Sequence, residues 1–234
     1  MNKVLFFSGS TITEDLAIQI AKYLGFEIND LTSFVDRESF DYSKKIDNLV
    51  FCFPVYSQNI ARPIKEILKK LQAKNIIIIA TYGKKGTGNV LYVASQLIKG
   101  NIIGGAYVPT KHTYLDEELF SEFDLLKNLL DKFKSNTQEV VFPKRKKHLF
   151  ANFFPEVRSR LGVKITRLNK CISCSICDSV CPMLAIENGR IKDNCIRCLR
   201  CVVFCPTNAL EVKIKKPLYK YLQKNMFDEL IIYK

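Results

Sequence analysis

Two cysteine-rich runs constrain this chain more than any other feature. Residues 171–182 read CISCSICDSVCP and residues 195–206 read CIRCLRCVVFCP, so both follow C-x2-C-x2-C-x3-C-P at an offset of 24. Over 171–186 and 195–210 the two segments are identical at seven of sixteen aligned positions. The N-terminus passes from a short apolar run straight into a Gly/Ser turn, which indicates a first strand rather than a signal peptide. Metal ligation is therefore favoured over disulfide formation.

The spacing within each run suits an iron–sulfur cube. Three thiolates on a tight loop can hold three corners of a 4Fe–4S cluster, and the fourth cysteine of the run ligates the other cluster. Zinc is the alternative, since paired C-x2-C units also bind zinc, but zinc gives no reason for the duplicated run. The predicted ligands of cluster one are Cys171, Cys174, Cys177 and Cys205, and those of cluster two are Cys195, Cys198, Cys201 and Cys181. The remaining cysteine, Cys52, is expected to be a buried strand residue.

The first 140 residues alternate apolar runs with helical patterns. This alternation is typical of an α/β domain whose parallel sheet carries helices on both faces. The near-continuous apolar strands fit burial on both sides. We therefore expect a five-stranded doubly wound parallel sheet with the strand order 2-1-3-4-5. Strands are predicted at 3–8, 26–31, 47–54, 75–81 and 101–109, and helices at 13–25, 62–72, 89–99 and 116–133.

Three loops are predicted to meet at the carboxyl ends of the strands, where doubly wound sheets bind their ligands. They are SGSTIT (8–13), PVYSQNIARP (54–63) and TYGKKGTGN (81–89). Hydroxyl side chains and backbone N–H groups at the start of the first helix suit a phosphate. Neither G-x-G-x-x-G nor G-x4-G-K-[ST] occurs, so a dinucleotide fingerprint is absent and ATP or GTP hydrolysis is disfavoured.

Because of these three loops, residues 1–138 resemble flavodoxin, a family that binds flavin mononucleotide (FMN). The resemblance implies that the first loop holds the phosphate and the later loops flank the isoalloxazine ring, on which a tyrosine would stack. The residues carried over are Ser8, Ser10, Thr11, Ile12 and Thr13 for the phosphate, and Pro54, Val55, Tyr56, Ser57, Thr81, Tyr82 and Gly83 for the ring. The family pattern [ST]-x-T-G-x-T is broken at Thr11, where glycine is usual, so the turn is expected to be crowded or changed. His112 is expected to be a surface loop residue.

Residues 165–214 resemble bacterial two-cluster ferredoxins, and all eight ligand positions match. The resemblance implies a small α+β domain that carries one electron per cluster at low potential. The charge departs from that family: residues 1–139 hold 17 Lys/Arg against 16 Asp/Glu, whereas residues 140–234 hold 19 against 7. Because Arg197 and Arg200 lie inside the second run, and positive charge favours the reduced cluster, its potential is expected to be raised.

Four parts are predicted along the chain: the FMN-binding domain (1–138), a basic and aromatic connector (139–164), the ferredoxin domain (165–214) and a C-terminal helix (215–234). The connector contains the basic run 144–147 and the aromatic residues Phe150, Phe153 and Phe154. The phenylalanines are expected to pack between the domains and the lysines to be solvated. The alternative is that this segment contacts a membrane surface.

This order of domains resembles a fusion family of anaerobic bacteria and archaea. The resemblance implies a cytoplasmic electron-transfer iron–sulfur flavoprotein with FMN and two 4Fe–4S clusters, which joins two-electron to one-electron chemistry. No catalytic side chain is required, and an electron carrier is favoured over a substrate-specific oxidoreductase. The expected partners are redox proteins with acidic docking surfaces. Two alternatives stay open: a flavin-dependent reductase that uses the clusters as a wire, and a binding module on a membrane or, less favoured, a nucleic acid.

Overall fold

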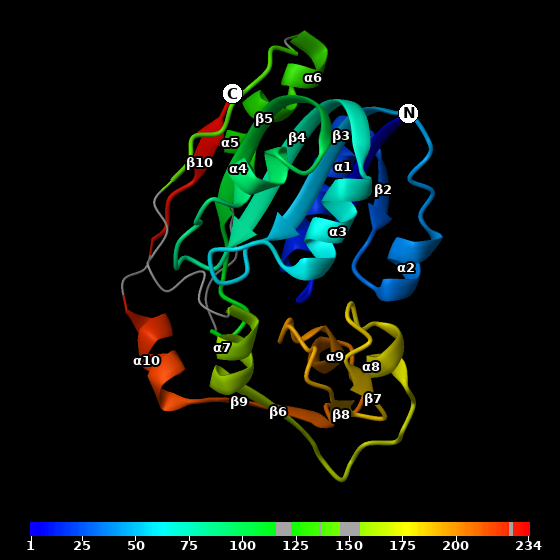
Figure 1. Cartoon of the computed structure of the whole chain (residues 1–234), viewed down its shortest axis with the longest axis vertical. Coiled ribbons are helices and arrows are strands. Elements are labelled where there is room, and N and C mark those ends of the chain that lie inside the picture. Colours follow the sequence, from blue (N-terminus) through cyan, green and yellow to red (C-terminus); the bar gives the residue numbers. More distant parts are fainter. Residues whose placement is uncertain (116–122, 136, 146–154, 225–226) are drawn as a thin grey trace.

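The computed structural model describes residues 1–115, 123–135, 137–145, 155–224 and 227–234. Its main sheet has the strand order β10-β5-β4-β3-β1-β2 (Figure 1). Five of these strands run parallel, and β10 pairs antiparallel with β5. The strands are β1 (Asn2–Phe6), β2 (Glu27–Asp30), β3 (Ile46–Pro54), β4 (Gln72–Tyr82), β5 (Lys99–Pro109) and β10 (Ile231–Tyr233).

Helices cover both faces of the sheet because its strands are apolar on both sides. On one face, Leu16 and Ile20 of α1 share a buried cluster with Leu126 of α5. On the other face, Ile64 of α3 and Leu91 of α4 belong to a second cluster. The helices of this part are α1 (Ile12–Leu24), α2 (Phe34–Ser39), α3 (Arg62–Lys70), α4 (Val90–Ser95), α5 (Asp124–Leu130) and α6 (Lys132–Ser135).

The mostly parallel α/β sheet agrees with the sequence prediction, but the predicted five-stranded sheet gains a sixth strand from the end of the chain. Residues 215–234, expected to be one helix, contain α10 (Lys216–Gln223) and then β10. Ile231 pairs with Tyr107 and Tyr233 with Gly105, so β10 covers the edge of β5. A strand of three residues carries no periodicity signal, which is why the pattern did not separate it from the helix.

The cysteine-rich part repeats its backbone as well as its sequence. The short helices α8 (Ile176–Ser179) and α9 (Arg200–Val203) begin 24 residues apart, and so do the left-handed residues Ser173 and Arg197. Two small antiparallel sheets complete this part. Their strands are β6 (Val163–Arg167) with β9 (Leu210–Ile214), and β7 (Ile186–Glu187) with β8 (Arg190–Ile191).

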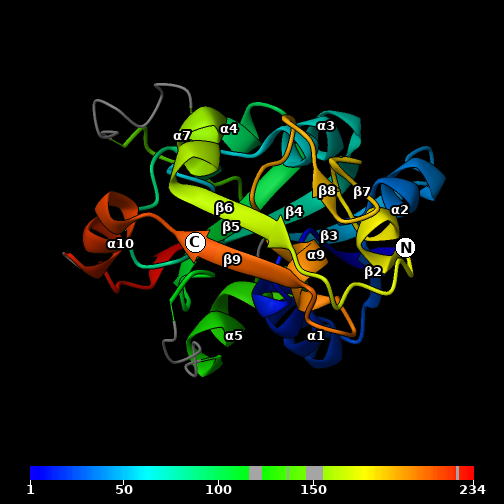
Figure 2. The same cartoon turned by 90° about the horizontal axis from the view of Figure 1, so that it is seen from below.

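The cysteine-rich part lies below the carboxyl ends of the parallel strands, with α7 (Pro155–Gly162) and α10 beside it (Figure 1). Figure 2 shows β6 and β9 on its outer side, away from the main sheet. One apolar cluster continues across the junction, because it joins Phe7 and Phe53 of the sheet to Met183, Ile196 and Leu199. The two parts therefore share a buried core.

The predicted connector is described only in part. Arg145 donates from Nη1 to Thr87 Oγ1 at 3.2 Å, and α7 begins within the connector. The residues outside the described ranges include Lys146, Lys147, Phe150, Phe153 and Phe154, as well as the first part (116–122) of the helix predicted at 116–133. Within the described ranges, no helix combines the length and the apolar character needed to cross a membrane.

Candidate functional site

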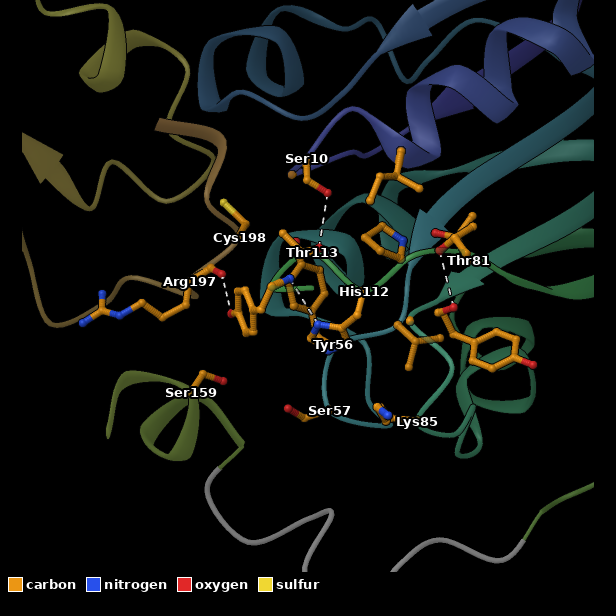
Figure 3. A pocket seen from close by; sticks show the side chains of 18 of the residues that line it. Ser10, Tyr56, Ser57, Thr81, Lys85, His112, Thr113, Ser159, Arg197 and Cys198 are labelled. Carbon is orange, nitrogen blue, oxygen red and sulfur yellow. Dashed lines mark hydrogen bonds between the residues drawn. The ribbon is translucent and has the colours of Figure 1, made fainter. Parts of the chain in front are cut away.

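A cavity of about 500 Å³ opens between the carboxyl edge of the main sheet and the cysteine-rich part. This volume is within the usual range for small-molecule sites. Figure 3 shows side chains from both parts around the same space. The lining comes from the three predicted loops, the loop after β5, the segment 196–198, and helices α7 and α10.

The first loop lies at the cavity wall and is tied to its neighbours. The hydroxyls of Thr13 and Thr81 are 2.7 Å apart, and Ser10 Oγ lies 3.3 Å from Thr113 Oγ1. These contacts hold the loop against the end of β4 and the loop after β5. The first-loop residues that line the cavity are Gly9, Ser10, Ile12 and Thr13, at the N-terminus of α1, where backbone N–H groups favour an anion.

Thr11 adopts the left-handed backbone conformation that glycine would favour, so the turn is strained. Its φ is 61° and its ψ is −24°, which is the left-handed region, and its side chain makes no capping bond to α1. That conformation costs an L-residue about 1–2 kcal/mol relative to the right-handed one. The departure predicted at this position is therefore a strained turn.

Replacing Thr11 by glycine is expected to raise the free energy of unfolding by up to about 1 kcal/mol, because relief of the strain exceeds the extra chain entropy of glycine. Anaerobic urea unfolding of the variant and the parent measures the difference. Thr166→Gly in β6 is the control and should be destabilising, since glycine weakens a strand. A Thr11→Gly protein that unfolds at lower urea than the parent would show that the turn is unstrained.

The second loop forms a tight turn that presents Tyr56. The backbones of Tyr56 and Asn59 exchange hydrogen bonds of 2.9 and 2.8 Å. Burial raises the pKa of the Tyr56 phenol well above its usual value, so the hydroxyl stays protonated. A Cβ built on Gly9 would lie 2.9 Å from Tyr56 Oη and 2.7 Å from the Cβ of Cys198, so the three residues meet at one point. The second-loop residues that line the cavity are Pro54, Val55, Tyr56, Ser57 and Gln58.

Tyr82 is the weaker of the two stacking candidates because its side chain is engaged elsewhere. Its buried hydroxyl donates to the Glu229 carbonyl at 2.5 Å and accepts from the Glu229 N–H at 3.0 Å. Its ring packs against Phe227 with centroids 5.9 Å apart. Tyr82 therefore anchors the C-terminal segment to the third loop. The predicted residues Thr81, Tyr82 and Gly83 all belong to the cavity lining.

The loop after β5 supplies cavity residues that the sequence prediction missed. His112, expected at the surface, lines the cavity against Gly83, and its Nδ1 accepts from the Tyr114 N–H at 3.2 Å. Burial, together with the charge of Lys85, lowers the pKa of His112 to about 4, so the imidazole is neutral at pH 7. The sequence could have indicated this loop by its position, because it also follows a strand at the edge of the sheet where ligands bind.

A second, small cavity is lined by all four cysteines that are predicted to hold cluster one. They are Cys171, Cys174, Cys177 and Cys205. The Ala209 N–H donates to Cys205 Sγ at 3.1 Å, and such a bond favours the thiolate. The fold thus brings the last cysteine of the second run back to the first three of the first run.

The four cysteines predicted for cluster two lie at the contact with the main sheet. Cys181, Cys195 and Cys201 are buried, and Cys198 reaches the main cavity. Burial raises the pKa of the Cys201 thiol, and the charges of Cys198, Cys195 and Cys181 raise it further. The Ala185 N–H donates to Cys181 Sγ at 3.2 Å, in the same way as its counterpart in the second run. Backbone donors and low solvent exposure are means by which proteins tune cluster thiolates.

Two buried arginines join the parts, one from each side. Arg200, inside the second run, donates to the Ser8 carbonyl at 2.7 Å and to Asp30 Oδ2 at 2.9 Å. Arg37, from α2, donates to the Pro182 carbonyl at 2.7 Å. Ser8, predicted to hold phosphate, is therefore buried in the contact between the parts.

The second cysteine run matches a known protein family. Residues 190–211 match the family described as the 4Fe-4S binding domain. No curated protein matches the chain. Within the described ranges, no three or more His, Cys, Asp or Glu side chains form a group that could hold a single metal ion.

Among solved structures, the chain is similar to a protein from Bacteroides uniformis ATCC 8492 that is described provisionally as a flavoprotein. The identity is 16%, the match covers 48% of this chain and 92% of that chain, and the TM-score is 0.36. What the comparisons support is a ferredoxin-type 4Fe–4S binding segment at residues 190–211 of this chain.

Proposed function

We propose that this protein transfers electrons between FMN, held at the edge of the main sheet, and two 4Fe–4S clusters held by the two cysteine runs. The observation that carries the proposal is the position of Cys198. This predicted cluster ligand lines the same cavity as the loops that resemble the FMN site of flavodoxin. FMN exchanges electrons singly or in pairs, whereas a 4Fe–4S cluster exchanges one at a time.

The residues around the cavity fit FMN in charge and in chemistry. Ser10, Thr13 and the first N–H groups of α1 would hold the phosphate. Tyr56 would flank the ring, and Lys85 adds positive charge to the wall for an anionic ligand. Because Nδ1 of the neutral His112 is an acceptor, the imidazole carries its proton on Nε2. No residue at this site has to act as an acid or a base for electron transfer.

Anaerobic purification followed by an absorption spectrum and flavin and iron assays tests the proposal. The expected result is about one FMN and about eight irons per chain. Cys198→Ala should lose about four of those irons, because it removes a ligand of one cluster. Cys52→Ala, which alters the cysteine outside the runs, should retain all of them. Iron without FMN would leave a ferredoxin, and FMN without iron would leave a flavodoxin.

A flavin-dependent reductase is the second candidate function, and one observation favours it. The cavity continues past the loops to α10, where Leu218, Tyr221 and Leu222 line it. An apolar wall of this kind would take a small substrate beside the flavin. Steady-state reduction of a small quinone without any protein partner, slowed by Tyr221→Ala, would favour the reductase. Electron transfer that requires a protein acceptor would favour the carrier.

A further inference from the structure

The two cysteine runs are copies in sequence, but they have different surroundings. Ile196 in the second run is 5% exposed, whereas Ile172, its counterpart 24 residues earlier, is 64% exposed. Arg200 is 6% exposed, and its counterpart Ile176 is 38% exposed. The surface of the second run is covered by the main sheet and its loops. The equivalent surface of the first run faces solvent.

We propose that this exposed surface, formed by Ile172, Ile176 and the loop around Cys174 and called here the outer face, docks a redox partner protein with acidic side chains around its own redox centre. This inference rests on the proposed function, and it identifies the outer face as the surface at which electrons leave the protein. The equivalent surface of the second run is already covered, by the main sheet that carries the proposed FMN site of this same chain. The partner gains one electron for each electron that this protein loses.

The outer face lies directly over the thiols predicted for cluster one. Ile172 and Cys174 line the small cavity together with Cys171, Cys177 and Cys205. A protein seated on the outer face is therefore brought next to these thiols. The thiols predicted for cluster two are mostly buried at the contact with the main sheet, so they offer no comparable approach from solvent.

The rim of the outer face is basic, which selects the charge of the partner. Arg167, Lys170 and Arg190 are exposed in the segments that flank it. The carboxylates of these segments already have partners, since Asp178 accepts from the Asn188 N–H at 3.1 Å and Glu187 pairs with Lys192 at 2.9 Å. Arg167 Nη2 donates to Ser173 Oγ at 3.2 Å, so this arginine is fixed beside the loop. A basic rim attracts and orients an acidic partner, and a second copy of this chain would bring two basic rims together. The apolar centre supplies surface that docking removes from water.

The test uses the whole reduced protein as donor and an acidic b-type cytochrome as acceptor, with anaerobic stopped-flow absorbance as the readout. Ile172→Glu is expected to lower the second-order rate about tenfold or more, as a central interface substitution does. Lys170→Glu and Arg190→Glu should also lower it, by an amount that shrinks as salt is added. Ile18→Glu, at a 49% exposed isoleucine on α1, is the matched control and should leave the rate unchanged.

Flavin and iron assays of every variant separate this inference from the proposed function. A parent protein without FMN or without clusters contradicts the proposed function. Fully loaded Ile172→Glu and Lys170→Glu proteins that reduce the cytochrome as fast as the parent overturn the outer face alone. A parent rate that does not fall with added salt overturns the acidic partner. If Ile172→Glu instead dissociates a dimer in sedimentation, or abolishes binding to phosphatidylserine vesicles, the face belongs to a second copy or to a membrane, and the inference is overturned.

Discussion

Replacing Arg200 by methionine is expected to lower the free energy of unfolding by about 2–4 kcal/mol. The buried guanidinium donates to the Ser8 carbonyl and to Asp30, and its centre lies 4.7 Å from the ring of Phe204. Methionine replaces much of the volume, but it leaves the carbonyl and the carboxylate without their donor in a site largely closed to water. Anaerobic urea unfolding, followed by far-ultraviolet circular dichroism, measures the change.

Two further variants isolate the cause of this loss. Arg200→Lys retains the charge but cannot reproduce the forked donors, so an intermediate loss is expected. Arg190→Met removes an exposed arginine of the same part and should change the free energy of unfolding by less than about 0.5 kcal/mol. Because positive charge favours the reduced cluster, Arg200→Met should also lower the potential of the cluster proposed at the second run, whereas Arg200→Lys should retain it. If Arg200→Met and Arg190→Met had equal free energies of unfolding, Arg200 would not stabilise the contact between the two parts.

The parallel sheet was predictable because its central strands carry continuous apolar runs. Residues 49–53 of β3 and 76–80 of β4 are buried along their whole length, which is the pattern of strands covered on both faces. The strand order then follows from short right-handed crossovers between neighbouring strands. The duplicated cysteine run was equally local, and the matching left-handed backbones of Ser173 and Arg197 show that it is a duplicated structure.

The features that the sequence did not reveal depend on contacts between distant residues. Arg200 and Ser8 are 192 positions apart, and a charged residue in a cysteine loop would ordinarily be expected in solvent. Loop position placed Ser8 and Tyr82 at the correct edge of the sheet, but it does not say which way a side chain lies. The Tyr82 hydroxyl is hydrogen-bonded to Glu229 near the end of the chain, and His112 is half-buried and packs on Gly83. Neither partner is near in sequence.

Replacing Gly9 by alanine is expected to weaken binding of the proposed FMN about tenfold or more, because overpacking of about 1–3 kcal/mol corresponds to that change in affinity. The added methyl would lie 2.7 Å from the Cβ of Cys198, and 2.9 Å from both the Cys198 carbonyl oxygen and Tyr56 Oη. The carbonyl belongs to the backbone, so the cysteine run and the first loop must move apart. Anaerobic titration of FMN fluorescence measures the affinity, and an iron assay reports whether the cluster predicted at Cys198 is retained.

A matched glycine substitution separates this steric effect from a general loss of stability. Gly25 has a φ of 67°, and an added Cβ there meets no atom within 4 Å. Gly25→Ala should therefore lower the free energy of unfolding by about 1 kcal/mol through backbone strain, with FMN affinity unchanged. Adding Tyr56→Phe to Gly9→Ala removes one of the three close atoms, so stability should partly recover. A Gly9→Ala protein with the FMN affinity and iron content of the parent would mean that the first loop and the second cysteine run are not in contact in solution. The cavity would then not be shared between the two parts.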